Sequence, residues 1–575
     1  MLRHPIFDAV MAHEVGHTLG LRHNFSGSYD ALNYHPRYWS LREDGRVAPR
    51  AWDPMTEAEI DGRIREYQYA SVMDYGHNFV VTDAEGIGHY DVAAIKMGYG
   101  DLVEVFENAP DPATVAWIGA ILRLGWPVAL RLESFTGGEP SAHPYTEWPQ
   151  ILGGRENIER RRDVPYTSLR PEPFLASEGI DEPSVDAEGR PVVPYLFCSD
   201  EQADLGPDCL RYDAGADPYE TLQSIIDAYF NYYIFNAYRR GRLGFDVGEY
   251  ADRILTRYLS KLQYANQIYA LFRPILEDIF GSDTDFFTRP DGMGAYTLGV
   301  GAGYQLLRQI VATPEPGTYV RRTRADGTAA LVPGGGFFGD VTVDSFDGRP
   351  LDTTWDFDAG YYWFDQLERV GYYYDKALAL WVLTDPETHF LGRDTAADVR
   401  QYQINYYTTF APSLTGFFGA LLADDWACLG ARALPDGSLR YPDARQTEAC
   451  TAPGVPIDPN ASFSIQLHGA VYGLTLISET FDNRFREDAR IFVRGAAEGV
   501  SVAPGTPVVE FTDPRTGLTY VALSRVESGR ERGAGARMLE HARALAARGA
   551  GAELDRFVDN IEVVRRIGWL VTHGD

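Results

Sequence analysis

The sequence contains few positively charged residues relative to negatively charged ones. Lys and Arg together number 52 against 82 Asp and Glu, which gives a formal net charge of −30 over 575 residues. Nucleic acids are bound through a basic surface that gathers their phosphates, so this balance argues against a nucleic-acid partner. A well-solvated acidic surface is the simplest interpretation of the excess.

Long apolar runs are also missing. The stretch 113–132 is apolar, but Arg123, Gly125 and Pro127 interrupt it, and no other stretch approaches the length of a membrane span. A span needs about 20 apolar residues, so a packed helix followed by a turn fits this stretch better. The first eight residues also contain no apolar core of a signal peptide. We expect no transmembrane segment in this chain.

Cysteine is scarce as well. The four cysteines form two local pairs, Cys198 with Cys209 and Cys428 with Cys450. Neither pair has CxxC spacing, which argues against zinc knuckles and redox motifs. Two loop-closing disulfides in an extracellular or periplasmic protein are one interpretation, and two pairs of reduced thiols in an intracellular protein are the other. We expect the two disulfides.

The strongest motif that is present lies close to the N-terminus. His13 and His17 are four residues apart, so on a helix both imidazoles project from one face, with Glu14 beside them. Gly20 can adopt the positive φ that ends a helix, after which the chain can turn back and bring His23 to the same point. Three imidazoles with one open position are typical of a catalytic zinc site, whereas a structural site closes all four positions.

The full spacing, HExxHxxGxxH, resembles that of the metzincin metalloproteases. Ser71-Val-Met73-Asp-Tyr75 resembles the methionine turn of astacin-like and serralysin-like members. In these proteins the methionine, here Met73, forms a hydrophobic floor below the metal ligands. The tyrosine, here Tyr75, can stabilise the oxyanion of the intermediate. Residues 91–100 resemble the helix that closes a metzincin catalytic domain. Asn24 departs from the pattern, because astacins have a glutamate there.

The resemblance implies a zinc-dependent endopeptidase that acts on protein or peptide substrates. One catalytic Zn²⁺ would be bound by His13, His17 and His23, with Glu14 as the general base. Some secreted metzincins also use Ca²⁺, which would suit the acidity, although no EF-hand or glycine–aspartate repeat is present. The alternative is a non-catalytic interaction protein or an inactive fragment that retains the zinc site. The intact Glu14 argues against it, because a decayed enzyme often loses its general base first.

A metzincin normally has a twisted sheet and a helix before this motif. The motif here begins almost at the first residue, so we expect the chain to be a fragment that starts within the catalytic domain. The missing upstream half would also carry the export signal.

The fold class that we expect is mainly α, in three parts. Residues 1–103 would form the C-terminal half of a metzincin catalytic domain, and 104–215 a connecting region with one helix and long loops. Residues 216–575 would form a mainly helical region with a few β-hairpins. This arrangement resembles large, poorly described bacterial zinc metalloproteases with a long C-terminal region. The apolar periodicity predicts helices at 56–67, 219–242, 247–280, 293–311, 363–383, 394–409, 413–422, 465–481, 534–545 and 552–570.

Three smaller expectations complete the analysis. Residues 24–54 should be a loop, in which Tyr34, His35, Tyr38 and Trp39 either line a substrate cleft or pack at the surface. His77 and His89 should be locally hydrogen-bonded histidines rather than metal ligands. Residues 508–511 and 519–522 should form a hairpin.

Overall fold

The structure is a computed structural model. It describes residues 3–42, 48–76, 86–108, 111–122, 128–131, 141–144, 148, 152, 154–173, 182–204, 208–237, 247–281, 285–290, 292–312, 317–323, 329–333, 341–343, 350–351, 375, 378–383, 406, 409–410, 414, 417–418, 432–433, 439–440, 487–496, 502–527, 529–531 and 533–573.

The chain divides into two compact units. The first comprises Met1–Ala228 and Leu271–Gly303, and the second Tyr229–Ala270 and Tyr304–Asp575. The described residues form mainly helices with a few small antiparallel sheets, so the predicted mainly α class is confirmed. None of the described helices is long and apolar enough to cross a membrane. The division into three parts stays a prediction.

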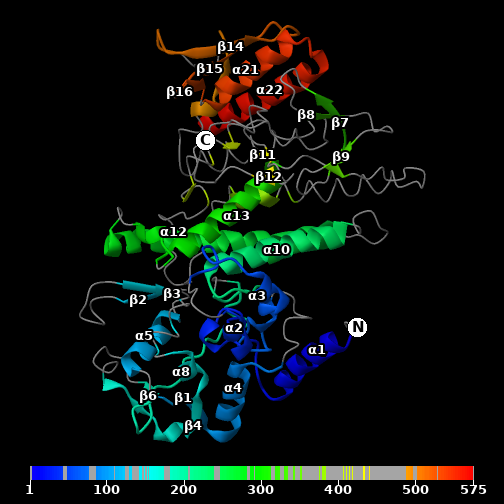
Figure 1. Ribbon diagram of the computed structural model, residues 1–575. Coiled ribbons are helices and arrows are strands. Elements are labelled where there is room, and N and C mark those ends of the chain that lie inside the picture. Colours follow the sequence, from blue (N-terminus) through cyan, green and yellow to red (C-terminus); the bar gives the residue numbers. More distant parts are fainter. Residues whose placement is uncertain are drawn as a thin grey trace. The chain divides into compact units, whose positions relative to one another are not determined.

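The first unit begins with four α-helices in chain order (Figure 1). They are α1 (Arg3–Thr18), α2 (Pro36–Leu41), α3 (Glu57–Asp61) and α4 (His89–Gly100). Thr56 and Glu59 form the predicted capping box at the start of α3. The helix predicted for 56–67 is interrupted, because Arg63 adopts the left-handed conformation with φ 58°. The chain continues as the 3₁₀ helix η2 (Ile64–Tyr67).

Most aromatic residues of the segment 24–54 lie in the core, but Trp52 is 37% exposed. Tyr34 and Tyr38 are 1% and 0% exposed, and Trp39, on α2, is buried and donates a hydrogen bond from Nε1 to Ala31 O at 3.1 Å. The segment also contains the 3₁₀ helix η1 (Ala31–Asn33) besides α2. The predicted loop with a cleft or surface role for these aromatics was therefore wrong. Burying three large rings stabilises the unit by several kcal/mol, at about 25 cal/mol per Å² of apolar surface.

A small two-stranded sheet follows α4. Strand β1 (Leu102–Phe106) pairs antiparallel with β4 (Arg161–Pro165), and a bridge joins Val105 to Val192. The predicted helix after residue 112 is confirmed as α5 (Pro112–Leu122). The connecting region was expected to consist otherwise of long loops. It also contains β2 (Val128–Arg131) paired with β3 (Ser141–Pro144), and the short helix α8 (Arg155–Glu159).

Three of the longest predicted helices are confirmed where the structure describes them. They are α10 (Pro218–Ala237), α12 (Ser260–Phe280) and α13 (Gly294–Ala312), with α11 (Val247–Ile254) and a π-helical turn (Leu255–Leu259) before α12. The predicted helices at 394–409, 413–422 and 465–481 lie largely or wholly outside the described residues.

The last part of the second unit is a small sheet packed against two helices. The predicted hairpin is confirmed as β14 (Val508–Thr512) and β15 (Thr519–Leu523), with β13 (Ile491–Val493) on the other side of β15. Helices α21 (Ala534–Ala547) and α22 (Gly551–His573) match the last two predicted helices and contact this sheet. Burial alternates along β14, which places Val509 and Phe511 in the core, whereas the middle three residues of β15, the central strand, are all buried.

Candidate metal centre

The site is built on the end of α1. Gly20 has φ +88°, as predicted, and the amide of Gly20 donates to His17 O while the amide of Leu21 donates to Gly16 O, both at 3.0 Å. These two bonds form a Schellman motif, in which a residue with positive φ closes the helix and reverses the chain. The reversal carries His23 back across the face of α1 that bears His13 and His17.

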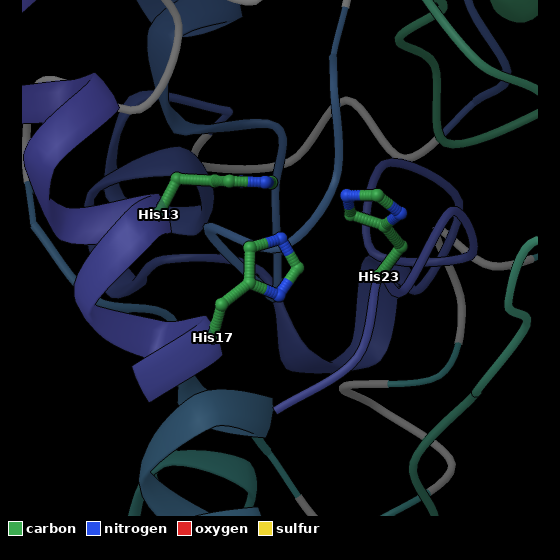
Figure 2. A group of neighbouring side chains, drawn as sticks. All are labelled: His13, His17 and His23. Atoms are coloured by element: carbon green, nitrogen blue, oxygen red, sulfur yellow. The ribbon is translucent and has the colours of Figure 1, made fainter. Parts of the chain in front are cut away.

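The three predicted imidazoles lie together. The ring centroids are 4.8 Å apart for His13 and His17, 5.3 Å for His13 and His23, and 4.8 Å for His17 and His23. Each side chain offers one ligand atom, and these three atoms lie within 4.8 Å of one another. Figure 2 shows the rings converging from α1 and from the segment that follows it. The sequence motif therefore produces one group and not three separate histidines.

Each imidazole has a hydrogen-bond partner at Nδ1. The Nδ1 atoms of His13 and His17 lie 2.7 Å from Val72 O and 3.0 Å from Leu21 O, and a carbonyl can only accept. The Nδ1 atom of His23 lies 2.9 Å from a carboxylate oxygen of Asp200. With the proton fixed on Nδ1 by these acceptors, the lone pair for a metal is on Nε2 in all three rings. Burial also lowers the pKa of His13, which favours the neutral ring that a metal ion requires. This donor set fits Zn²⁺.

The methionine turn lies against α1. Met73 is fully buried and packs with Tyr69, Val72 and Leu21. A side chain at Gly16 would place its Cβ 2.3 Å from Met73 Sδ, so the helix and the turn can approach this closely only because Gly16 has none. The role of Gly16 was not predicted, although it stands between the two motif histidines in the printed sequence.

Asp91 supports the turn from below and was also missed. Its carboxylate accepts from Ser71 Oγ at 2.6 Å and from the amides of Val72 and Gly88 at 2.8 Å each. Asp91 lies in the first turn of α4, the helix that was predicted from the family resemblance. An acidic residue three positions after the N-cap residue is a recognisable sign of a helix start, and it explains the bond from the amide of Gly88. The bonds from Ser71 and Val72 depend on tertiary structure.

Tyr75 reaches the group of histidines. Its hydroxyl lies 3.2 Å from His23 Nε2, and its ring packs 4.9 Å from the ring of His23 and 5.1 Å from that of Phe25. Burial raises the pKa of Tyr75, so the hydroxyl keeps its proton at neutral pH and can donate it in a hydrogen bond. The hydroxyl therefore lies beside the Nε2 atom of His23.

Glu14 is exposed on α1 and forms no hydrogen bond or ion pair with any other residue that the structure describes. Its negative charge nevertheless acts on the site: it partly opposes the burial that lowers the pKa of His13, and it adds to the burial that raises the pKa of Tyr75. A carboxylate without a structural partner is available to accept a proton.

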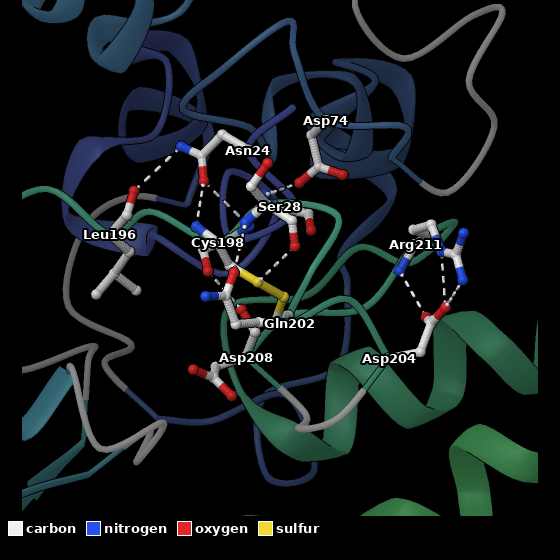
Figure 3. Close-up of a disulfide and its surroundings, with 12 residues drawn as sticks. Asn24, Ser28, Asp74, Leu196, Cys198, Gln202, Asp204, Asp208 and Arg211 are labelled. Atoms are coloured by element: carbon white, nitrogen blue, oxygen red, sulfur yellow. Dashed lines mark hydrogen bonds and ion pairs between the residues drawn. A yellow bond between two sulfur atoms is a disulfide. The ribbon is translucent and has the colours of Figure 1, made fainter. Parts of the chain in front are cut away.

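Asn24, the residue that departs from the astacin pattern, joins three segments. Its amide donates to Met73 O at 3.1 Å, its Nδ2 donates to Leu196 O at 3.1 Å, and its Oδ1 accepts from the amide of Cys198 at 3.0 Å. Cys198 and Cys209 form a disulfide with their Cα atoms 5.9 Å apart (Figure 3). The segment around this disulfide thus belongs to the site, which its turn-rich sequence did not reveal.

The remaining candidates from the sequence are His77, His89, Cys428 and Cys450. His77, Cys428 and Cys450 lie outside the described residues. His89 is largely buried, and desolvation lowers its pKa to about 3. In the part of the chain that the structure describes, the three histidines are the only group of His, Cys, Asp and Glu side chains arranged to hold a metal ion. A Ca²⁺ site stays a prediction.

Comparison with known families agrees with this geometry. A family model described as Met-zincin matches residues 2–35, which include α1 and all three histidines. This part of the chain is metzincin-like, and the match suggests a zinc metallopeptidase. No curated protein and no solved structure matches the chain. The resemblance of the C-terminal region to large bacterial proteases stays a prediction.

Proposed function

We propose that this metzincin-like chain is a zinc-dependent endopeptidase. The observation that carries the proposal is the convergence of three imidazoles whose Nδ1 atoms are all held by acceptors, which leaves three Nε2 atoms for one ion. A structural zinc site would add a fourth protein ligand. Within the described residues the group has three members, which supports a site with one open position.

Each site residue then has a distinct role. His13, His17 and His23 would hold Zn²⁺. When bound, the ion supplies Lewis acidity that polarises a peptide carbonyl and lowers the pKa of water toward about 7. Glu14 accepts the proton of the attacking water and later gives it to the leaving amine. The Tyr75 hydroxyl donates a hydrogen bond to the oxyanion that develops on the carbonyl oxygen.

The substrate that we propose is a protein or peptide in an oxidising compartment. The disulfide Cys198–Cys209 supports an extracellular or periplasmic location, because such bonds are rare in the cytosol. A second disulfide between Cys428 and Cys450 is part of the same proposal. Mass mapping of the exported protein without reduction tests it, and four free thiols would contradict it.

Glu14→Gln in the full chain tests the mechanism. The variant should keep its zinc, because Glu14 is not a ligand, while kcat falls roughly 10²–10⁴-fold for loss of the general base. Tyr75→Phe should lower kcat by roughly 10²–10³-fold with little change in KM, since its hydroxyl acts on charge formed in the transition state. Peptide cleavage and zinc content are measured on the same preparations.

A matched control is Glu57→Gln, which changes an exposed carboxylate at the start of α3 and should leave kcat unchanged. Near-normal turnover of Glu14→Gln would contradict the mechanism. The alternative, a non-catalytic protein that retains a zinc site, predicts that the wild-type chain binds zinc and cleaves no peptide.

A further inference from the structure

His23 differs from the other two histidines in what holds its Nδ1 atom. His13 and His17 each have a backbone carbonyl as the partner, whereas His23 lies 2.9 and 3.0 Å from the two carboxylate oxygens of Asp200. Asp200 follows His23 by 177 residues. A charged acceptor makes the imidazole more basic and fixes its orientation more strongly than a carbonyl does.

The residues next to this pair form a second contact. Arg22 donates from Nη2 to Glu201 at 2.6 Å, so two consecutive residues after α1 meet two consecutive residues of the later segment. Both side chains are more than half exposed. An ion pair of this kind contributes little to stability by itself. Because no histidine takes part in it, the Arg22–Glu201 ion pair can serve as a control for the neighbouring His23–Asp200 contact.

The segment that carries Asp200 is held in place on both sides. Before Asp200, Cys198 O accepts from the amide of Phe25 at 2.7 Å. After it, the Cys198–Cys209 disulfide closes the loop, and Asp204 accepts from Arg211 Nε at 2.7 Å and donates from its amide to Cys209 O at 2.7 Å. Figure 3 shows the disulfide between the Asn24 contacts and the Asp204–Arg211 pair. We call residues 198–204 and 208–209 the Asp200 loop.

We propose that Asp200 is a positioning residue for the third metal ligand, and that the disulfide of the Asp200 loop delivers it. Asp200 keeps the proton of His23 on Nδ1 and directs Nε2 toward the Nε2 atoms of His13 and His17. The affinity for zinc therefore depends on a carboxylate outside the HExxHxxGxxH motif. The inference rests on the zinc site of the proposed function but not on peptidase activity.

Zinc affinity measured by competition with a chelator tests this inference directly. Asp200→Ala should bind zinc roughly 10–100-fold more weakly than the wild type, the usual range for loss of a partner of a metal-bound histidine. Asp200→Asn keeps an acceptor oxygen and should fall between the two. The control is Glu201→Gln, which weakens the adjacent Arg22–Glu201 contact and should change the zinc affinity less than twofold. Because Asp200 is about half exposed, these variants should fold normally, which urea midpoints of the metal-free proteins verify.

A second readout separates positioning from general stabilisation. With Co²⁺ in place of zinc, the visible absorption reports the ligand geometry, and it should change in Asp200→Ala but not in Glu201→Gln. A purely structural role of Asp200 would instead lower the urea midpoint and leave the spectrum of the folded protein unchanged.

A double-mutant cycle tests whether the disulfide affects zinc binding through Asp200. Cys198→Ser/Cys209→Ser should weaken zinc binding by loosening the Asp200 loop, and it should weaken binding little further when Asp200 is already alanine. Wild-type affinity in Asp200→Ala, or an equal loss in Glu201→Gln, would overturn this inference and leave the proposed function standing. A wild-type chain that binds no zinc would overturn both. A chain that binds zinc tightly and cleaves no peptide would overturn only the proposed function.

Discussion

The helix and the extended segment that together supply the metal ligands are built in different ways. His13 and His17 lie on α1, where backbone hydrogen bonds within one helix fix their separation. His23 lies on an extended segment, where its neighbour Asn24 donates hydrogen bonds to Met73 O and Leu196 O. Two ligands are therefore placed by local structure, and the third depends on residues far along the chain.

Burial shows the same contrast. On α1 every fourth residue from Phe7 through Met11 and Val15 is a large apolar side chain that is at least 42% exposed. Between Asn24 and Tyr34, by contrast, all residues are buried. Helix α1 is held by its own backbone hydrogen bonds although one apolar face is exposed to solvent. The conformation of the segment after it depends on packing in the core. Perturbing one or the other should therefore have different consequences.

The largest effect is expected for a ligand on the helix. His17→Ala removes one of three donors, so the protein should retain no zinc after dialysis and should have no measurable peptidase activity. The fold should survive, because among the residues that the structure describes the His17 side chain has a single hydrogen bond, to Leu21 O in the adjacent turn. Atomic absorption measures the zinc content and circular dichroism the fold of the same sample. Full zinc retention by His13→Ala/His17→Ala would rule out the assigned ligands.

The segment should respond through the fold as well as through the metal. Asn24→Ala leaves the amide of Cys198 and the carbonyl of Leu196 buried without partners, at roughly 1–3 kcal/mol each. The free energy of unfolding should therefore fall by about 3 kcal/mol, and zinc affinity should fall with it. Urea titration measures the first quantity. Asn108→Ala, which loses an exposed hydrogen bond to Asn157, is the control and should change it by less than about 0.5 kcal/mol.

Acid should weaken the support beneath the methionine turn. Burial lowers the pKa of His89, the first residue of α4, from 6.5 to about 3. Above pH 6.5 His89 is neutral in both the folded and the unfolded chain, so it does not affect the free energy of unfolding. Below pH 6.5 the unfolded chain binds a proton at His89 while the folded protein does not, which favours unfolding. The free energy of unfolding should thus fall by about 2 kcal/mol between pH 7 and pH 5 on account of this residue.

His89→Gln isolates that contribution. Urea midpoints are compared for wild type and variant at both pH values with a chelator present, so that the other histidines contribute equally. Equal pH dependence of the two proteins would show that His89 does not remain neutral in the fold.

The smallest effect concerns the contact between the helix and the methionine turn. Gly16→Ala improves helix propensity, but the added Cβ would meet Met73 Sδ, so the free energy of unfolding should fall by about 1–2 kcal/mol net. Gly98→Ala in α4 is the matched control. Its Cβ meets nothing within 4 Å, and the variant should gain about 0.5–1 kcal/mol. Equal gains for both would mean that Gly16 does not constrain the approach of Met73.

The parts of the fold that could be predicted from the sequence are those governed by local periodicity and turn chemistry. Helices α10, α12 and α13 and the hairpin of β14 and β15 follow from apolar spacing and from a clear turn at 513–517. The aromatic segment 24–54 was mistaken for a loop because its helices are short and its rings have no regular period. The pairing of β1 with β4 was missed because β4 begins with three charged residues, Arg161 to Asp163, which resemble a surface connection.

By itself the sequence indicated that His13, His17 and His23 come together through the reversal at Gly20, because four-residue spacing and a positive φ are local properties of the chain. The catalytic roles of Glu14 and Tyr75 stay predictions. The sequence also indicated the pair Cys198 and Cys209. Only the tertiary structure decided which ring nitrogen of His13 and of His23 is free, since the acceptors Val72 O and Asp200 come from segments 59 and 177 residues away. It likewise decided that Asn24 joins three segments and that Gly16 makes room for Met73. The physical reason is that a hydrogen bond or a close approach between distant segments is specified by the packing of the core, which no spacing along the chain records.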